Sequence, residues 1–213
     1  ILMLISVVNV GVCALDENVL VRITFNRVDD FKWTPEYPDD FLQEKNLKIA
    51  INNGTYAKDG VIFGDPTFLE GRNEGTAMGF DGQDDKMMLN AKDISNFSEG
   101  TISLWLKISS FSISSDRQYI YCSYSNSNDG LYLFLLNNGY LQFDLYSRAT
   151  NQRFTVSRDI TPWVGDGEWH HIFISWKCGE QLRLLLDGGR ERVLSLEGLS
   201  QVDISGTDWR SEE

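Results

Sequence analysis

The chain has 213 residues, of which 42% are hydrophobic and 12% aromatic, and its formal net charge is −12. This length and apolar content are enough for one domain with a sizeable core. The acidic charge disfavours nucleic acid and anionic membrane surfaces, which are bound through basic patches, and it is compatible with cation binding.

The first fourteen residues carry no charge and are mostly aliphatic. They are too few to span a bilayer, which takes about 20 residues. Residues 1–14 therefore predict part of a secretory signal peptide with the cleavage site Val12-Cys13-Ala14. This interpretation implies a secreted or extracellular-surface protein without membrane insertion. Two alternatives remain, in which Cys13 is an acylated first residue or the segment is a buried first strand.

The N-terminal half then alternates short strand patterns with polar segments. Val19–Phe25 is rich in β-branched residues and predicts a strand. A long polar segment from 26 to 47 follows. Further short strands are expected at 48–51 and 56–63, and a hairpin is expected between 76–81 and 86–89.

From Gly100 onward the pattern becomes regular, with short apolar runs separated by Gly, Asn and Asp clusters. Asn138-Gly139 is a strong hairpin signal because both residues tolerate positive φ. No stretch has the pattern of a helix of three turns. Strands at this spacing predict an all-β, antiparallel two-sheet sandwich. They are expected at 102–108, 118–123, 131–136, 141–146, 153–157, 170–176, 182–186 and 192–196.

One stretch carries a specific resemblance. Asp166-Gly167-Glu168-Trp169-His170-His171, a hydrophobic strand and then Leu182-Arg183-Leu184-Leu185-Leu186-Asp187-Gly188 resemble the laminin-G-like, concanavalin A-like jelly roll, which is related to pentraxins. Phe80-Asp81-Gly82, Thr101–Lys107 and Asn53-Gly54-Thr55 match other family segments in the right order. The resemblance implies that residues 15–200 form one jelly-roll domain.

The C-terminal end departs from that family. Its members carry a closing strand after the Asp-Gly hairpin, which returns beside the first strand, whereas residues 201–213 form a polar tail. We therefore expect a truncated domain that lacks its closing strand. Val19–Phe25 would then have an unpaired edge, which predicts edge-to-edge self-association of the truncated chain.

The resemblance also implies calcium, which laminin-G-like domains hold through loop oxygens of the kind that hard cations require. Asn128 and Asp129 match a calcium-binding pair in reversed order. Asp81, Asp84 and Asp85 crowd three carboxylates into one turn and are the second candidate. The alternative for both is ordinary turn chemistry, in which Asn, Asp and Gly are common.

Sugar recognition would use exposed aromatic rings. Trp163 and Trp33 lie in predicted loops and are the candidate ligand-binding residues, although a loop tryptophan can instead cover a sheet edge. Cys122 and Cys178 are the candidate disulfide pair, with two free thiols as the alternative. Asn53 and Asn96 begin glycosylation sequons.

Fold alone does not decide function, because this fold hosts lectins, glucanases and adhesion modules. The Glu-x-Asp-x-Glu pattern of the fold's retaining glucanases is absent from the sequence. The favoured hypothesis is a non-catalytic module that binds a glycan or glycoprotein, with calcium as the expected cofactor. The alternatives are a glycoside hydrolase or its accessory domain, and a structural adhesion module of a larger protein.

Overall fold

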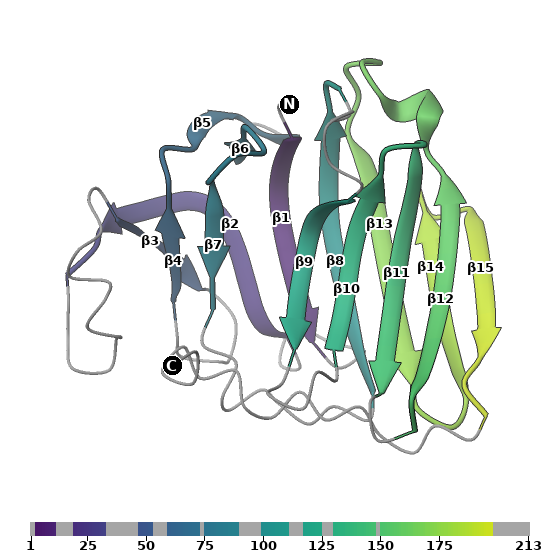
Figure 1. Ribbon diagram of the computed structural model, residues 1–213. Helices are drawn as coiled ribbons and strands as arrows, with labels where there is room; N and C mark the ends of the chain where they lie inside the picture. Colours follow the sequence, from purple (N-terminus) through teal and green to yellow (C-terminus); the bar gives the residue numbers. More distant parts are fainter. Residues whose placement is uncertain are drawn as a thin grey trace.

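The computed structural model describes residues 3–11, 19–32, 47–52, 59–72, 75–89, 99–110, 117–124, 130–147 and 150–197. Strands make up most of these residues, and they form two sheets that face each other (Figure 1). The strands are β1 (Met3–Gly11), β2 (Val19–Asp30), β3 (Lys48–Asn52), β4 (Gly60–Phe63), β5 (Thr67–Glu70), β6 (Thr76–Phe80), β7 (Lys86–Met88), β8 (Glu99–Ile108), β9 (Arg117–Tyr124), β10 (Gly130–Leu136), β11 (Tyr140–Ser147), β12 (Gln152–Asp159), β13 (His170–Lys177), β14 (Gln181–Leu186) and β15 (Arg190–Ser195).

The larger sheet has the strand order β15-β14-β13-β8-β1-β2-β3-β4-β7, and β5 and β6 join it where β6 pairs with β1. The smaller sheet has the order β12-β11-β10-β9. Every pairing between named strands is antiparallel. The predicted antiparallel two-sheet sandwich is confirmed. Among the described residues, no helix is long and apolar enough to cross a membrane.

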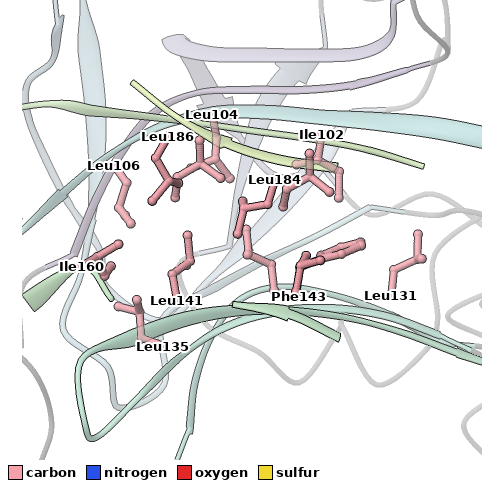
Figure 2. Packing of buried hydrophobic residues seen from close by; sticks show 14 of the residues in the cluster. Ile102, Leu104, Leu106, Leu131, Leu135, Leu141, Phe143, Ile160, Leu184 and Leu186 are labelled. Carbon is pink, nitrogen blue, oxygen red and sulfur yellow. The ribbon is translucent and has the colours of Figure 1, made fainter. Parts of the chain in front are cut away.

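The core follows from strand alternation. In β8 every second residue is buried, because neighbouring side chains of a strand point to opposite faces. Ile102 and Leu104 of β8 thus face Leu141 and Phe143 of β11 across the space between the sheets (Figure 2). Burying each such side chain contributes about 1.5–3 kcal/mol, so this interface holds the two sheets together.

Two predicted turns form as hairpins with different geometries. Asp187 and Gly188 have φ of 51° and 69°, and Gly189 N–H donates to the Leu186 carbonyl at 3.1 Å. Positive φ at both central residues defines a type I′ turn, which explains the Asp-Gly sequence. In the β10–β11 hairpin only Gly139 has positive φ, at 87°.

Strand β1 departs from the expected organisation. Residues 3–11, expected within a signal peptide, pair with β8 on one side and with β6 and β2 on the other. The run of aliphatic and β-branched residues that resembles a signal peptide also suits a strand. The signal-peptide interpretation stays a prediction, although residues 3–11 form a paired strand of the larger sheet in this structure.

In the full chain the first domain strand does not have the open edge expected of residues 15–213, and the expectation for the shorter chain stays a prediction. Strand β2 pairs with β1 through Val8↔Ile23 and Val10↔Val21, and with β3 on its other side. Strand β1 therefore covers the edge of β2 from Val19 to Ile23, and it lies where the missing closing strand was expected. The physical reason for self-association through β2 is absent while β1 stays in the sheet.

The expected hairpin between residues 76–81 and 86–89 is also wrong. Both strands form, but β6 pairs with β5 and β1, whereas β7 pairs with β4. The intervening turn, in which Gly82 has a φ of 77°, redirects the chain to another part of the sheet. The turn therefore connects the β5–β6 pair to the β4–β7 pair.

Candidate functional site

The turn between β6 and β7 brings its three carboxylates together as predicted. One oxygen of each of Asp81, Asp84 and Asp85 lies within 4.8 Å of the others. Asp85 accepts hydrogen bonds from the backbone N–H groups of Asp65 and Asp81, each at 3.0 Å. We call these three carboxylates the acidic turn, and their oxygens are of the type that calcium prefers.

Gly64 fixes the position of Asp85. Its φ is 81°, and a Cβ at this position would lie 2.5 Å from Asp85 Oδ1. A larger residue at position 64 would displace the carboxylate. Asp84, by contrast, is exposed at the tip of the acidic turn.

Trp163 does not offer the free ring expected of a sugar-stacking residue. It belongs to a short 3-10 helix, Thr161–Trp163, and only 8% of its surface is exposed. Its ring stacks on His170, with 4.1 Å between centroids and 6° between planes. Trp163 therefore packs into the core at the start of β13, an inner strand of the larger sheet, which corrects its assignment to ligand binding.

The adjacent histidines have separate surroundings. His170 Nδ1 lies 2.9 Å from Asp187 Oδ2, and its Nε2 lies 2.9 Å from Asp166 Oδ2. His171 Nε2 lies 2.9 Å from Ser103 Oγ on the outer face of the larger sheet. The pair therefore does not converge on one ion.

The candidate disulfide does not form, because Cys122 and Cys178 are both free. Cys122 lies in β9 of the smaller sheet, whereas Cys178 follows β13 of the larger sheet. Cys122 is exposed as a residue, yet desolvation of its sulfur by neighbouring atoms raises the pKa of the thiol to about 11. The thiol is therefore protonated at neutral pH and is a poor nucleophile.

The other candidate residues lie outside the described part of the chain. These are the ligand-binding candidate Trp33, the calcium candidates Asn128 and Asp129, and the sequon residues Asn53 and Asn96.

The outer face of the smaller sheet carries a cluster that the sequence interpretation missed. Leucines alternate with other residues along β10 and β11 and face the core, so the residues between them face outward. We call this set the tyrosine face, and it comprises Tyr119, Tyr132, Phe134, Asp144 and Tyr146.

Tyr119 is the accessible ring of the tyrosine face. Its exposed fraction is 50%, and its centroid lies 5.6 Å from that of Phe134 and 6.4 Å from that of Tyr132. Both contacts are tilted, a favourable arrangement for aromatic pairs. The neighbouring rings thus hold Tyr119 in place while leaving half of it open.

Asp144 places a carboxylate among these rings. Although it lies on the outward side of β11, only 2% of its surface is exposed. Gln142 Nε2 donates to its Oδ1 at 2.8 Å, and Thr155 Oγ1 donates to the same oxygen at 2.7 Å. Arg153 Nη1 lies 3.7 Å from its Oδ2. These partners offset the cost of burying the charge.

The signal for the tyrosine face was present in the sequence. Tyr132-x-Phe134 and Gln142-x-Asp144-x-Tyr146 alternate with core leucines inside strands that were predicted correctly. The spacing identifies two outward rows, but only the register between strands shows that they adjoin. In the structure Tyr132 is opposite Asp144, and Phe134 is opposite Gln142.

Comparison with known proteins gives a family match. A model described as the concanavalin A-like lectin/glucanases superfamily matches residues 81–208, more than half of the chain. No curated protein sequence matches the chain.

Several solved structures are similar in fold. The botulinum neurotoxin serotype G binding domain is 11% identical with a TM-score of 0.59, and the match covers 72% of this chain and 38% of that one. The binding domain of Paraclostridial Mosquitocidal Protein 1 is 16% identical with a TM-score of 0.59, covering 72% and 39%. The botulinum neurotoxin serotype D ligand binding domain in complex with N-acetylneuraminic acid is 17% identical with a TM-score of 0.58, covering 76% and 39%. The chain thus spans about two fifths of these structures, and the likeness concerns the fold.

Proposed function

This chain belongs to the concanavalin A-like lectin/glucanases superfamily, and from that premise we propose that it is a non-catalytic, secreted or cell-surface module that binds a glycan or glycoprotein. The tyrosine face is the proposed binding surface. Aromatic rings bind the apolar faces of sugars, while fixed polar groups hydrogen-bond to the hydroxyls.

The observation that carries this proposal is the half-exposed ring of Tyr119, which lies on the same face of the smaller sheet as Asp144 and its partners, with β10 between them. Tyr119 supplies a pre-positioned stacking surface. Asp144 fixes the orientations of Gln142 and Thr155, so little conformational entropy is lost when a ligand binds. An aromatic anchor in a polar surround is a common arrangement of binding hot spots.

The choice of sugar is a further part of the proposal. Arg117 and Arg153 lie at the tyrosine face, where their guanidinium groups approach the rings of Phe134 and Tyr146 at 4.9 Å and 5.5 Å. Guanidinium groups can pair with a sugar carboxylate. We therefore include sialylated glycans, since a similar domain has been solved with N-acetylneuraminic acid.

A glycan array tests the proposal. The wild type should bind a restricted set of glycans, and Tyr119→Ala should weaken that binding about tenfold or more because it removes the exposed ring. Leu69→Ala is a matched control, since Leu69 is 42% exposed but lies on β5 of the other sheet.

Three results would contradict the proposal in different ways. Binding that survives Tyr119→Ala would place the site elsewhere. Binding to proteins but to no glycan would favour a structural adhesion module. Reducing-sugar release from β-glucan would identify a glycoside hydrolase. This is the main alternative, because the family includes glucanases.

Calcium binding at the acidic turn is a second proposal. Its support is the gathering of three carboxylate oxygens within 4.8 Å. Calcium at a hundred times its dissociation constant should stabilise the protein by about 2.7 kcal/mol. Thermal unfolding in millimolar calcium and in chelator measures this shift.

Asp84→Asn should remove most of the calcium shift, because it neutralises one carboxylate at the exposed tip of the acidic turn. Glu70→Gln is the control, as it removes one exposed carboxylate on β5. Identical unfolding curves in calcium and chelator would contradict a calcium site in the acidic turn.

A further inference from the structure

The larger sheet carries a basic and aromatic cluster on its outer face, at the end opposite the β13–β14 turn. It comprises Arg72, Trp105, Lys107, Trp169 and His171, and we call it the Arg72 patch. We propose that the Arg72 patch binds a tetrahedral oxyanion, namely a sulfate or phosphate group. This site is separate from the tyrosine face and does not depend on the glycan-binding function proposed above.

Strand register builds the floor of the Arg72 patch. Trp105 and Lys107 are outward residues of β8, because the alternate positions Leu104 and Leu106 are buried. His171 of β13 is opposite Trp105, and the centroids of their rings lie 4.8 Å apart. Three of the five side chains therefore emerge from adjoining positions on one face of a paired sheet.

Arg72 reaches the patch from the loop between β5 and β6. Its guanidinium carbon lies 3.7 Å from the centroid of the Trp105 ring. The loop backbone is held by two hydrogen bonds, from Gly71 N–H to the Gly75 carbonyl at 2.6 Å and from Gly75 N–H to the Arg72 carbonyl at 3.2 Å. Stacking uses the flat face of a guanidinium, whereas its N–H donors lie at the edge. The stack therefore orients a hydrogen-bonding fork before any ligand arrives, which lowers the entropic cost of binding.

Lys107 supplies a second permanent cation. Its Nζ lies 5.9 Å from the centroid of the Trp169 ring. Trp105 and Lys107 are two residues apart on one strand, which places their Cα atoms about 7 Å from each other. Among the described residues, none accepts a hydrogen bond from the indole N–H of Trp105 or Trp169. The patch thus combines two cations with indole N–H groups, all of which only donate hydrogen bonds.

The neighbouring carboxylates are engaged elsewhere. Asp166 lies near Lys107, and its electrostatic interaction with this lysine helps to lower the pKa of the carboxyl, after the larger effects of a backbone hydrogen bond and of His170. Asp187 acts electrostatically on His171. Each of the two carboxylates has one oxygen 2.9 Å from a nitrogen of His170, and its other oxygen accepts a hydrogen bond from a backbone N–H. These acidic groups therefore do not take the place of an external anion at the patch.

The arrangement suits an oxyanion better than a sugar ring. Arg72 already stacks on Trp105 and His171 packs against the same indole, so this ring lacks the open surface that Tyr119 has. A phosphate or sulfate ester offers three acceptor oxygens, enough for the fork, the ammonium and an indole N–H, whereas a carboxylate offers two. The net charge of −12 opposes an anion at long range, but physiological salt screens that repulsion beyond about 8 Å.

The experiment follows the indole N–H signals of the six tryptophans by ¹H–¹⁵N NMR. Sodium sulfate, sodium phosphate and methyl phosphate are titrated at pH 7, with sodium chloride keeping the ionic strength constant, and Trp105→Phe assigns its signal. Sulfate or phosphate should shift the Trp105 signal in a saturable manner, and acetate should bind about tenfold more weakly because it has fewer acceptor oxygens. No saturable shift, or an equal affinity for acetate, overturns the proposal.

Methyl phosphate separates two sources of the group. Binding at least as tight as that of inorganic phosphate supports a site for an ester carried by a larger molecule. Binding of the inorganic ions alone supports a site for the free anion.

Two substitutions at Arg72 test the fork. Arg72→Gln should weaken the probe about tenfold or more, because the charge-assisted hydrogen bonds are lost. Arg72→Lys keeps the charge but not the planar fork, so it should also weaken the probe, to a smaller extent. Arg72 is exposed, so the melting temperature of the free protein should change little in either variant. Wild-type affinity in Arg72→Lys would show a diffuse effect of charge and would overturn a defined site.

Arg117→Gln is the matched control. Arg117 is also exposed and its guanidinium also lies over an aromatic ring, 4.9 Å from the centroid of Phe134, but it belongs to β9 of the smaller sheet. The Trp105 shift should persist in Arg117→Gln and in Tyr119→Ala, even where these changes abolish binding at the tyrosine face. A loss of the shift in Arg117→Gln as large as that in Arg72→Gln would show a response to net charge alone, which overturns the Arg72 patch.

Discussion

The two histidines that begin β13 show how a strand gives neighbouring residues different roles. His170 joins three segments of the chain, because its nitrogens contact Asp166 in one loop and Asp187 in another while its ring stacks on Trp163. Asp187 also accepts a hydrogen bond from the His171 N–H at 2.8 Å. The conformation of the Asp187-Gly188 turn thus orients the carboxylate that fixes the start of β13.

His171 gives a pH prediction. Desolvation by burial lowers the pKa of its imidazole below 6.5, opposed by Asp187 and assisted by Arg72. The unfolded chain therefore binds the proton more tightly than the folded chain does. The stability that depends on neutral His171 is complete above pH 6.5 and declines as the pH falls through the lowered pKa.

The measurement compares wild type with His171→Gln in urea at pH 7.5 and pH 5.5. The difference in unfolding free energy between the two proteins should shrink at the lower pH. His170 is present in both proteins, so its own effect cancels in this comparison. A difference that stays constant or grows at pH 5.5 would contradict the prediction.

At the scale of elements, the alternation of apolar residues and the positions of turn residues account for most of the strands that were predicted correctly. The strands after Gly100 form close to their predicted limits. In β8, β10, β11, β13 and β14 this is because buried residues stand at every second position between clear turns. The partners of β6 and β7 could not be predicted from alternation and turn residues. Their alternation indicates strands, but partner choice depends on β1, β4 and β5, which lie elsewhere in the sequence.

Gly100 is an element-scale test of packing between β8 and β13. Gly100→Ala should destabilise the protein by about 1–3 kcal/mol, because its Cβ would meet the fixed ring of Trp176. Gly189→Ala is a matched control, since a Cβ there meets nothing within 4 Å. Urea unfolding measures both variants, and equal midpoints would show that Trp176 can move aside.

At the scale of the whole molecule, the site was harder to predict than the fold. The family resemblance and strand spacing gave the sandwich correctly. The acidic turn is local in sequence and was found, whereas the tyrosine face combines residues of β9, β10 and β11 and needs their register. Trp163 was misassigned because a loop position does not show what packs on its ring.

The central position of β1 gives the last prediction. Removing residues 1–14 would leave β2 and β8 without the strand between them, so two rows of backbone groups would lose their partners. Residues 15–213 should therefore melt at a lower temperature than residues 1–213 and should associate through the exposed edges.

Light scattering coupled to size-exclusion chromatography measures the association, and a synthetic peptide of residues 3–11 tests its cause. The peptide should restore the monomer if it enters the slot between β2 and β8, whereas a scrambled peptide should not. A monomeric 15–213 protein with the melting temperature of the longer chain would show that β1 is dispensable, as expected of a leader. Association that the peptide reverses would instead show that the sandwich requires an apolar strand at this position, whichever segment supplies it.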